Sequence, residues 1–142
     1  MKTVQVGCAI VVLEGRILIA QRHSNSLFEP NKWEFPGGKL KESETFEDCI
    51  RRELREELGI EVGNLERYLT HYHTYRTPKQ RTVELHVYTT TLTQGPIRLL
   101  DAQDAVWVAK DQITDYCFVD GDKLIVTMLL NDWETIAKHK KT

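Results

Sequence analysis

Residues 38–60 read GKLKESETFEDCIRRELREELGI, and the fold of the chain can be predicted from the pattern in this stretch. Apolar side chains recur there at every fourth position: Phe46, Ile50, Leu54 and Leu58. This spacing predicts an amphipathic helix over residues 45–58, with one face docked on a core. Ser43 or Thr45 can cap its N-terminus, and Gly59 can adopt the left-handed conformation that ends a helix. The stretch therefore predicts a glycine loop, a helix and a glycine stop.

The opposite face of this predicted helix is acidic. Glu53, Glu56 and Glu57 stand at i, i+3 and i+4, which places three carboxylates within about a third of the helix circumference. Such carboxylates repel one another unless a cation lies between them. Mg²⁺ binds carboxylate oxygens and keeps coordination positions open for substrate phosphates. A solvated helix face with local ion pairs is the alternative interpretation.

The spacing of the fixed residues resembles a known motif. Its pattern is Gly, five residues, Glu, seven residues, Arg-Glu, an aliphatic residue, any residue, Glu-Glu, any residue, Gly and an aliphatic residue. Every fixed position is satisfied, by Gly38, Glu44, Arg52, Glu53, Leu54, Glu56, Glu57, Gly59 and Ile60. This is the pattern of the Nudix box, so the chain resembles the Nudix hydrolase family.

The resemblance implies an enzyme that hydrolyses a nucleoside diphosphate linked to another moiety. In the family, the carboxylates that match Glu53, Glu56 and Glu57 hold Mg²⁺, helped by a glycine carbonyl near Gly37. Mn²⁺ is an alternative ion.

The resemblance also implies roles around the metal. Glu53 and Arg52 are the candidate catalytic residues. Glu53 is the candidate general base, and Arg52 is expected to pair with and orient the acids rather than take part in the chemical step. Glu44 supports the loop or binds metal weakly. Family members often recruit another acid from a later loop, and here Asp101 and Asp104 are both candidates.

The context of the box, WEFPGGKLKESET, is similar to the MutT and CTP-pyrophosphohydrolase branch of the family. In that branch a residue at the start of the last helix reads the base edge. Asp122 matches this position, and a helix cap is its alternative role. Arg22 and Arg81 are candidates for phosphate or base contacts, or else ordinary strand-end charges. Phe35 can stack on a base or pack in the core.

These features predict a Mg²⁺-dependent hydrolase that converts a nucleoside triphosphate to the monophosphate and pyrophosphate. An 8-oxo-dGTP-like or cytidine nucleotide is the expected substrate. Two alternatives stay open. One is hydrolysis of a dinucleotide, nucleotide sugar or RNA 5′ end. The other is a nucleotide-binding module without catalysis, although such modules commonly lose box acids and this chain keeps them all.

The whole sequence of 142 residues predicts a single domain over residues 1–142. A net charge of −2 does not favour bulk nucleic acid or an anionic membrane as partner. We expect a cytoplasmic protein, monomeric or homodimeric, whose partner is a small nucleotide. The cysteines Cys8, Cys49 and Cys117 have no metal-type spacing and are predicted to be reduced core or near-core thiols.

The remaining chain predicts a set of strands and one further helix. The strands are expected at residues 3–13, 16–22, 65–75, 81–93 and 105–108. The helix is expected over residues 122–139, capped by Asp120 or Asp122, with Trp133 near an exposed end where it could mediate dimerisation. Its apolar positions are Leu124, Ile125, Met128, Leu129, Trp133 and Ile136. This order predicts an α/β fold with a mixed sheet between two main helices, which agrees with the α/β/α sandwich of the Nudix family.

Overall fold

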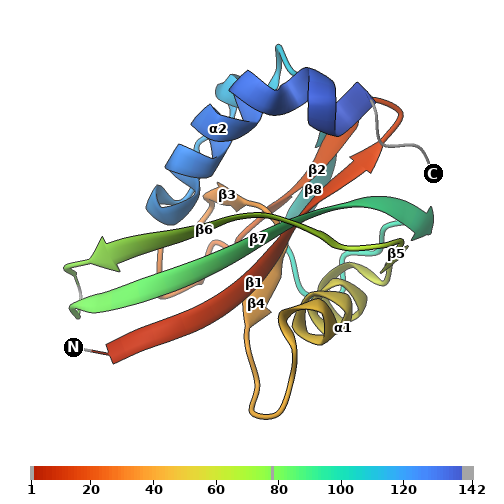
Figure 1. Ribbon diagram of the computed structural model, residues 1–142. Coiled ribbons are helices and arrows are strands. Elements are labelled where there is room, and N and C mark those ends of the chain that lie inside the picture. The colour runs from red at the N-terminus through yellow and green to blue at the C-terminus, as the bar shows by residue number, and fades with distance from the viewer. Residues whose placement is uncertain (1, 78, 139–142) are drawn as a thin grey trace.

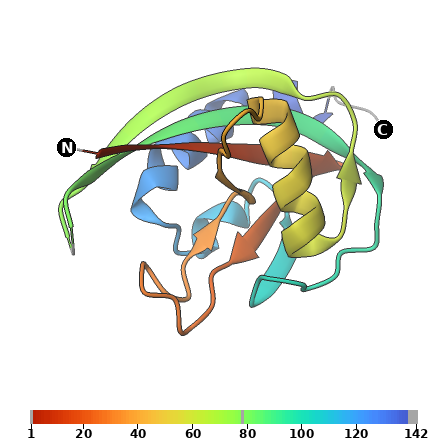
Figure 2. The same cartoon turned by 90° about the horizontal axis from the view of Figure 1, so that it is seen from below.

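The computed structural model describes residues 2–77 and 79–138. Over these residues one mixed sheet contains β1 (Lys2–Leu13), β2 (Arg16–Gln21), β3 (Trp33–Glu34), β4 (Gly37–Lys39), β5 (Glu61–Val62), β6 (Glu66–Tyr75), β7 (Arg81–Gln94) and β8 (Asp104–Val108). The helices α1 (Phe46–Leu58) and α2 (Lys123–Trp133) lie on opposite sides of the sheet (Figure 1). Figure 2 shows α1 in front of the strands and α2 behind them. The predicted sandwich is therefore confirmed.

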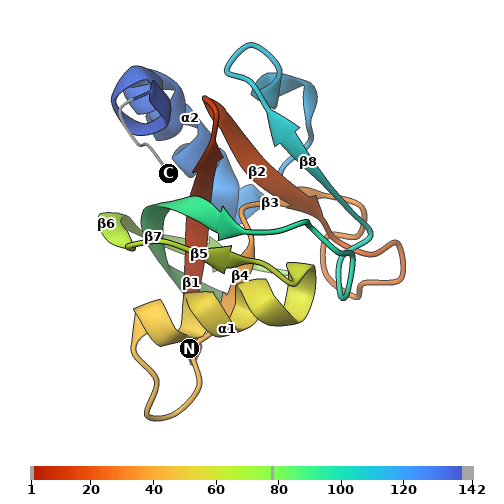
Figure 3. The same cartoon turned by 90° about the vertical axis from the view of Figure 1, so that its right-hand side faces the viewer.

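The long strands β1 and β7 run parallel at the centre of the sheet, in a register that begins at Lys2 opposite Arg81. The neighbours of this pair are antiparallel: β2 and β4 pair with β1, and β5 and β6 pair with β7. β2 also pairs with β3 and β8. In Figure 3, α1 crosses beneath the sheet and β4 lies beside it. This topology brings the residues before α1 against the middle of β1.

Both faces of β1 are buried from Gly7 to Val12, which explains the continuous apolar sequence of this part of the strand. Cys8, Ile10 and Val12 belong to the core on the α2 side. Ala9 and Val11 belong to the core on the α1 side. Alternate residues of one strand thus contribute to two separate cores, because successive side chains point to opposite faces.

The ends of α1 are specified locally. Thr45 is its N-cap: Thr45 Oγ1 accepts from the Asp48 N–H (3.1 Å), and the Asp48 carboxylate accepts from the Thr45 N–H. Gly59 ends the helix at φ 65°. The predicted stripe is buried at Ile50, Leu54 and Leu58, and each fully buried aliphatic side chain of this kind contributes about 1.5–3 kcal/mol.

The second helix differs from the prediction at its C-terminal end and in the burial of Trp133. The α-helix ends at Trp133 and continues as a short π-helical segment, Glu134–Lys138. Of the apolar positions with helical spacing, Leu124 and Met128 are 47% and 39% exposed. The buried stripe runs through Ile125, Leu129 and Trp133, which are also among the predicted apolar positions. Because Trp133 is buried, it cannot form the dimer contact suggested by its position near the end of the chain.

The cysteines divide into two classes. Cys8 and Cys49 are buried as predicted, whereas Cys117 is exposed and its prediction as a core thiol is wrong. Cys117 lies between the short 3-10 helices η1 (Ile113–Asp115) and η2 (Asp120–Asp122), where no strand or helix buries it. Within the part of the chain that the structure describes, no helix is long and apolar enough to cross a membrane.

Candidate active site

A cleft of about 620 Å³ lies between the loop after β2, the strands β1, β4 and β7, and the start of α2. One group of lining residues comes from the glycine pair and α1: Gly37, Gly38, Glu53 and Glu57. A second group combines aromatic, basic and acidic side chains from four segments: Phe28, Tyr75, Arg81 and Asp122. The cleft therefore presents an acidic region and a mixed aromatic and polar region to one ligand.

Glu53 and Glu57 form the acidic region. They are one helical turn apart on α1, and both line the cleft. Burial, followed by the charge of Glu53, raises the pKa of Glu57 far above its ordinary range. Two facing carboxylates need either a shared proton or a cation between them. A metal ion that binds here would displace the proton that Glu57 keeps.

The glycine pair allows β4 to pass close to this acidic pair. A Cβ on Gly38 would lie 2.3 Å from the Glu53 carboxyl carbon, so only glycine leaves room for that carboxylate. A Cβ on Gly37 would lie 2.0 Å from the Gly7 carbonyl oxygen of β1. The prediction of a glycine loop is corrected here, because both residues belong to β4 and pair with β1.

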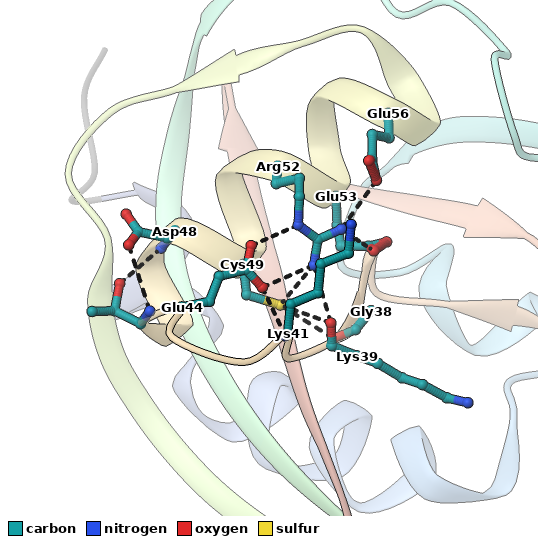
Figure 4. Close-up of polar contacts among 10 residues, drawn as sticks. Gly38, Lys39, Lys41, Glu44, Asp48, Cys49, Arg52, Glu53 and Glu56 are labelled. Carbon is teal, nitrogen blue, oxygen red and sulfur yellow. Dashed lines mark hydrogen bonds and ion pairs between the residues drawn. The ribbon is translucent and has the colours of Figure 1, made fainter.

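Arg52 organises the acids around it (Figure 4). Its Nε and Nη2 donate to the two carboxylate oxygens of Glu44, at 2.6 and 2.9 Å. Its Nη1 donates to Glu53 (2.8 Å) and Glu56 (3.0 Å). The guanidinium lowers the pKa of Glu44 to about 2. Arg52 therefore contacts three carboxylates at once, and Glu44 also accepts from the Lys41 N–H (2.9 Å).

Glu56 is the predicted metal ligand that the structure does not bring into the cleft. Its half-exposed carboxylate pairs with Arg52, and it is absent from the cleft lining. For residues 2–77 and 79–138, no three His, Cys, Asp or Glu side chains already converge on a metal-binding point. Rotation of the Glu56 side chain away from Arg52 is needed for it to join Glu53 and Glu57.

The residues nevertheless fit a hard dication. The paired carboxyls of Glu53 and Glu57 supply oxygen ligands, and the cradle against Gly38 leaves them space. Members of the family generally use a divalent metal ion, and this donor set suits one.

Neither predicted later acid lines the cleft. Asp101 is exposed and lies 3.4 Å from His23 Nε2, although its backbone N–H donates to the Glu57 carbonyl (3.0 Å). Asp104 accepts from the N–H of Ala105 within its own strand. Asp101 is therefore the nearer of the two to the acidic pair.

Sequence reasoning missed Glu34 as a site residue. Its side chain lines the cleft and pairs with Arg22 Nη1 at 3.4 Å. Burial raises its pKa, and the neighbouring Glu29 and Glu53 charges act in the same direction. The sequence signal that could have identified Glu34 was its position in the β3 segment, three residues before Gly37.

Arg22 and Phe35 both line the cleft, but structural contacts occupy them. Arg22 donates to the Phe28 carbonyl oxygen and to Ser26 Oγ, both at 2.9 Å, in addition to Glu34. Phe35 is buried in the core, with its ring centroid 5.5 Å from that of Phe118.

Arg81 and Asp122 are better disposed toward a ligand. The Arg81 guanidinium lies over the Phe28 ring, 4.1 Å from its centroid, and its buried Nε has no hydrogen-bond partner among residues 2–77 and 79–138. Asp122 is buried, and its Oδ2 accepts from the Phe35 N–H (2.9 Å). Asp122 occupies the N-cap position of α2, but within the described residues its side chain makes no capping hydrogen bond to the helix. Asp120 does not replace it, since that carboxylate pairs with Lys123.

The burial of Asp122 leads to a pH-dependent prediction. Burial raises its pKa to about 8, whereas an unfolded Asp titrates near 4. Between these values the unfolded chain has lost the proton that the folded chain keeps, so this group lowers stability as pH rises from about 4 to 8. We expect Asp122→Asn, which keeps an acceptor for Phe35, to melt roughly 3 °C or more above the wild type at pH 8 and close to it at pH 4.

Thermal unfolding across this pH range measures the effect. Asp120→Asn is the matched control: this neighbouring carboxylate is exposed and Lys123 lowers its pKa, so its variant should show no such gain. An Asp122→Asn melting difference that stays constant from pH 4 to 8 would contradict a raised pKa.

Comparison with known proteins agrees with this geometry. The NUDIX domain family model matches residues 1–134. The chain is 34% identical over 122 residues to the CTP pyrophosphohydrolase of Escherichia coli (strain K12), covering 86% of this chain and 87% of that protein. It is 30% identical over 132 residues to the 8-oxo-dGTP diphosphatase of Haemophilus influenzae, covering 92% and 94%. The solution structure of the E. coli ORF135 protein superposes with a TM-score of 0.77 at 31% identity, covering 93% and 91%. The chain therefore belongs to the NUDIX domain family.

Proposed function

We propose that this protein hydrolyses a nucleoside triphosphate to the monophosphate and pyrophosphate, with Mg²⁺ bound by Glu53, Glu56 and Glu57 beside Gly37. Hydrolysis of an acid anhydride follows from family membership and from the names of the relatives, a pyrophosphohydrolase and a diphosphatase. The same relatives favour a cytidine or 8-oxo-dGTP-like nucleotide as substrate. Mn²⁺ is an alternative ion at the same site.

A single observation carries the proposal: one cleft joins the acidic pair to an aromatic and polar region. Phosphates need the cation held by Glu53 and Glu57, because the acids alone would repel them. A base needs the aromatic ring, the guanidinium and the carboxyl group of the second region. A nucleoside triphosphate carries both parts in one molecule.

The chain's own residues have distinct roles in this reaction. A bound Mg²⁺ would neutralise the phosphates and lower the pKa of a coordinated water. Glu53 is the proposed general base, and Arg52 holds it through the 2.8 Å contact of Nη1. At the other region, Arg81 is proposed to contact the substrate through its unpartnered Nε, while Asp122 reads the base edge. Arg22 and Phe35 shape the wall rather than bind.

Pyrophosphate release at pH 8 with Mg²⁺ tests the proposal, using normal and oxidised nucleoside triphosphates beside several dinucleotides. Strong preference for one triphosphate, with monophosphate and pyrophosphate as products, is the expected result. Turnover of a dinucleotide alone would replace the substrate class. Absence of turnover with nucleotide binding retained would favour a binding module.

A further inference from the structure

The loop between β2 and β3, residues 22–32, contributes to the lining of the cleft. It is drawn in orange in Figure 2. Four consecutive residues of this loop line the cleft: Ser26, Leu27, Phe28 and Glu29. The loop has no strand or helix of its own, and side-chain contacts add to its few backbone hydrogen bonds, such as that from the Arg22 N–H to the Lys32 carbonyl (2.9 Å). Arg22 makes the first set of side-chain contacts, because its guanidinium donates hydrogen bonds to the Phe28 carbonyl oxygen and to Ser26 Oγ.

Glu29 supplies the second set and ties three segments together. Its carboxylate accepts from the Asp120 N–H, at 3.0 and 3.3 Å to the two oxygens. It also accepts from the hydroxyl of Tyr75 (3.3 Å), and the Tyr75 oxygen in turn accepts from the Gly121 N–H (2.9 Å). One carboxylate thus joins the loop to the end of β6 and to η2, which leads into Asp122.

These contacts place Phe28 as an aromatic wall of the cleft. Its ring packs edge-on against Tyr75, with centroids 4.8 Å apart and planes at 77°. The Arg81 guanidinium covers the ring at 4.1 Å. Glu29, the next residue in the chain, adds contacts to Tyr75 and η2 to those that Phe28 itself makes.

The backbone of the loop favours release when that attachment is lost. Glu29 has φ 46° and Asn31 has φ 65°. A non-glycine residue in this left-handed region is strained, and such strain persists only where the surroundings enforce it. For Glu29 the surrounding contacts are those of its carboxylate, together with a hydrogen bond from the Lys32 N–H to its carbonyl oxygen (3.4 Å).

We propose that Glu29 is a positioning residue that holds Phe28 against the base of the bound nucleotide, and so determines nucleotide affinity. The inference rests on the proposed function for the identity of the ligand, but the attachment of the loop is testable without turnover. Glu29 lies outside the Nudix box and acts on Phe28, not on the phosphates, so its loss should raise KM and leave kcat nearly unchanged.

Three variants test the proposal. Glu29→Ala removes all the carboxylate contacts and should raise KM about tenfold, with kcat within about twofold of wild type. Glu29→Gln keeps one acceptor oxygen and should recover part of the affinity. Glu14→Ala is the matched control, because Glu14 is an exposed glutamate with a similar φ of 51° in the β1–β2 turn. It should match the wild type.

Chymotrypsin cleavage after Leu27 or Phe28, followed by mass spectrometry without nucleotide, measures loop release directly. Glu29→Ala should be cleaved there at least about fivefold faster than the wild type and Glu14→Ala, because the freed loop enters the protease more often. Near-ultraviolet circular dichroism verifies that the rest of the fold is retained.

The outcomes separate the two proposals. Wild-type cleavage and KM in Glu29→Ala would overturn the positioning role, as would a fall in kcat with KM unchanged. If no triphosphate is turned over by the wild type, the proposed function fails. Faster cleavage of Glu29→Ala would then still establish that Glu29 holds the loop.

Discussion

Replacing Glu53 with glutamine is expected to lower kcat by about a thousandfold or more, with the fold intact. The change is nearly isosteric, so the helix and the cradle against Gly38 are kept. It removes the negative charge that would bind the cation beside Glu57, and it removes the proposed general base. General-base catalysis alone contributes about 10²–10⁴-fold, and the loss of a metal ligand adds to it.

The measurement is steady-state pyrophosphate release combined with Mg²⁺ titration calorimetry. Glu47→Gln is the matched control, since Glu47 is an exposed glutamate in the first turn of the same helix, and it should retain wild-type turnover. If Glu53→Gln kept more than a tenth of the activity, another acid would have to be the base, and Glu57 would become the first candidate. Loss of turnover with unchanged Mg²⁺ affinity would assign Glu53 to proton transfer alone.

The adjacent glycines are expected to fail in different ways when each is changed to alanine. A Cβ on Gly38 meets the end of the Glu53 side chain at 2.3 Å. That carboxylate can move by a rotation, so Gly38→Ala should fold but lose at least about a hundredfold in kcat through the misplaced acid. A Cβ on Gly37 meets the backbone of Gly7 at 2.0 Å and Cys8 Cα at 2.6 Å. Backbone in a paired strand cannot yield, so Gly37→Ala should not fold stably.

Thermal unfolding and kinetics on the same preparations distinguish these results. Gly38→Ala should melt within a few degrees of the wild type, whereas Gly37→Ala should be insoluble or melt more than about 10 °C lower. A Gly38→Ala variant with wild-type kcat would contradict the close approach of β4 to Glu53. A stable Gly37→Ala variant would contradict the observed pairing of β4 with β1.

The local pattern was enough to predict α1 and its acids, because their determinants are close in sequence. The apolar period, the Thr45 cap and the Gly59 stop act within a few residues of one another. The long strands were predicted for the same reason, since alternation and turn residues are local signals. The short strands β3, β4 and β5 were not predicted as paired elements, because pairing with β1, β2 and β7 defines them.

The roles of single side chains depended on contacts that have no local signal. Leu124 and Met128 have helical spacing, but the position of α2 on the sheet leaves them exposed. Glu56 satisfies the box, yet Arg52 holds it outside the cleft. Glu34 carries no motif of its own and joins the site only because β3 lies beside β2.

The sequence by itself determined the family, the acidic helix and the reaction class that these imply, because nine spaced residues within 23 positions carry that information. Only the tertiary structure decided which side chains share the cleft. Asp122 meets the Phe35 N–H, and Glu29 meets Tyr75 and η2, across separations of 87, 46 and 91 residues. Contacts over such distances form when the sheet assembles, since they depend on strand order and helix placement, and a local sequence pattern specifies neither.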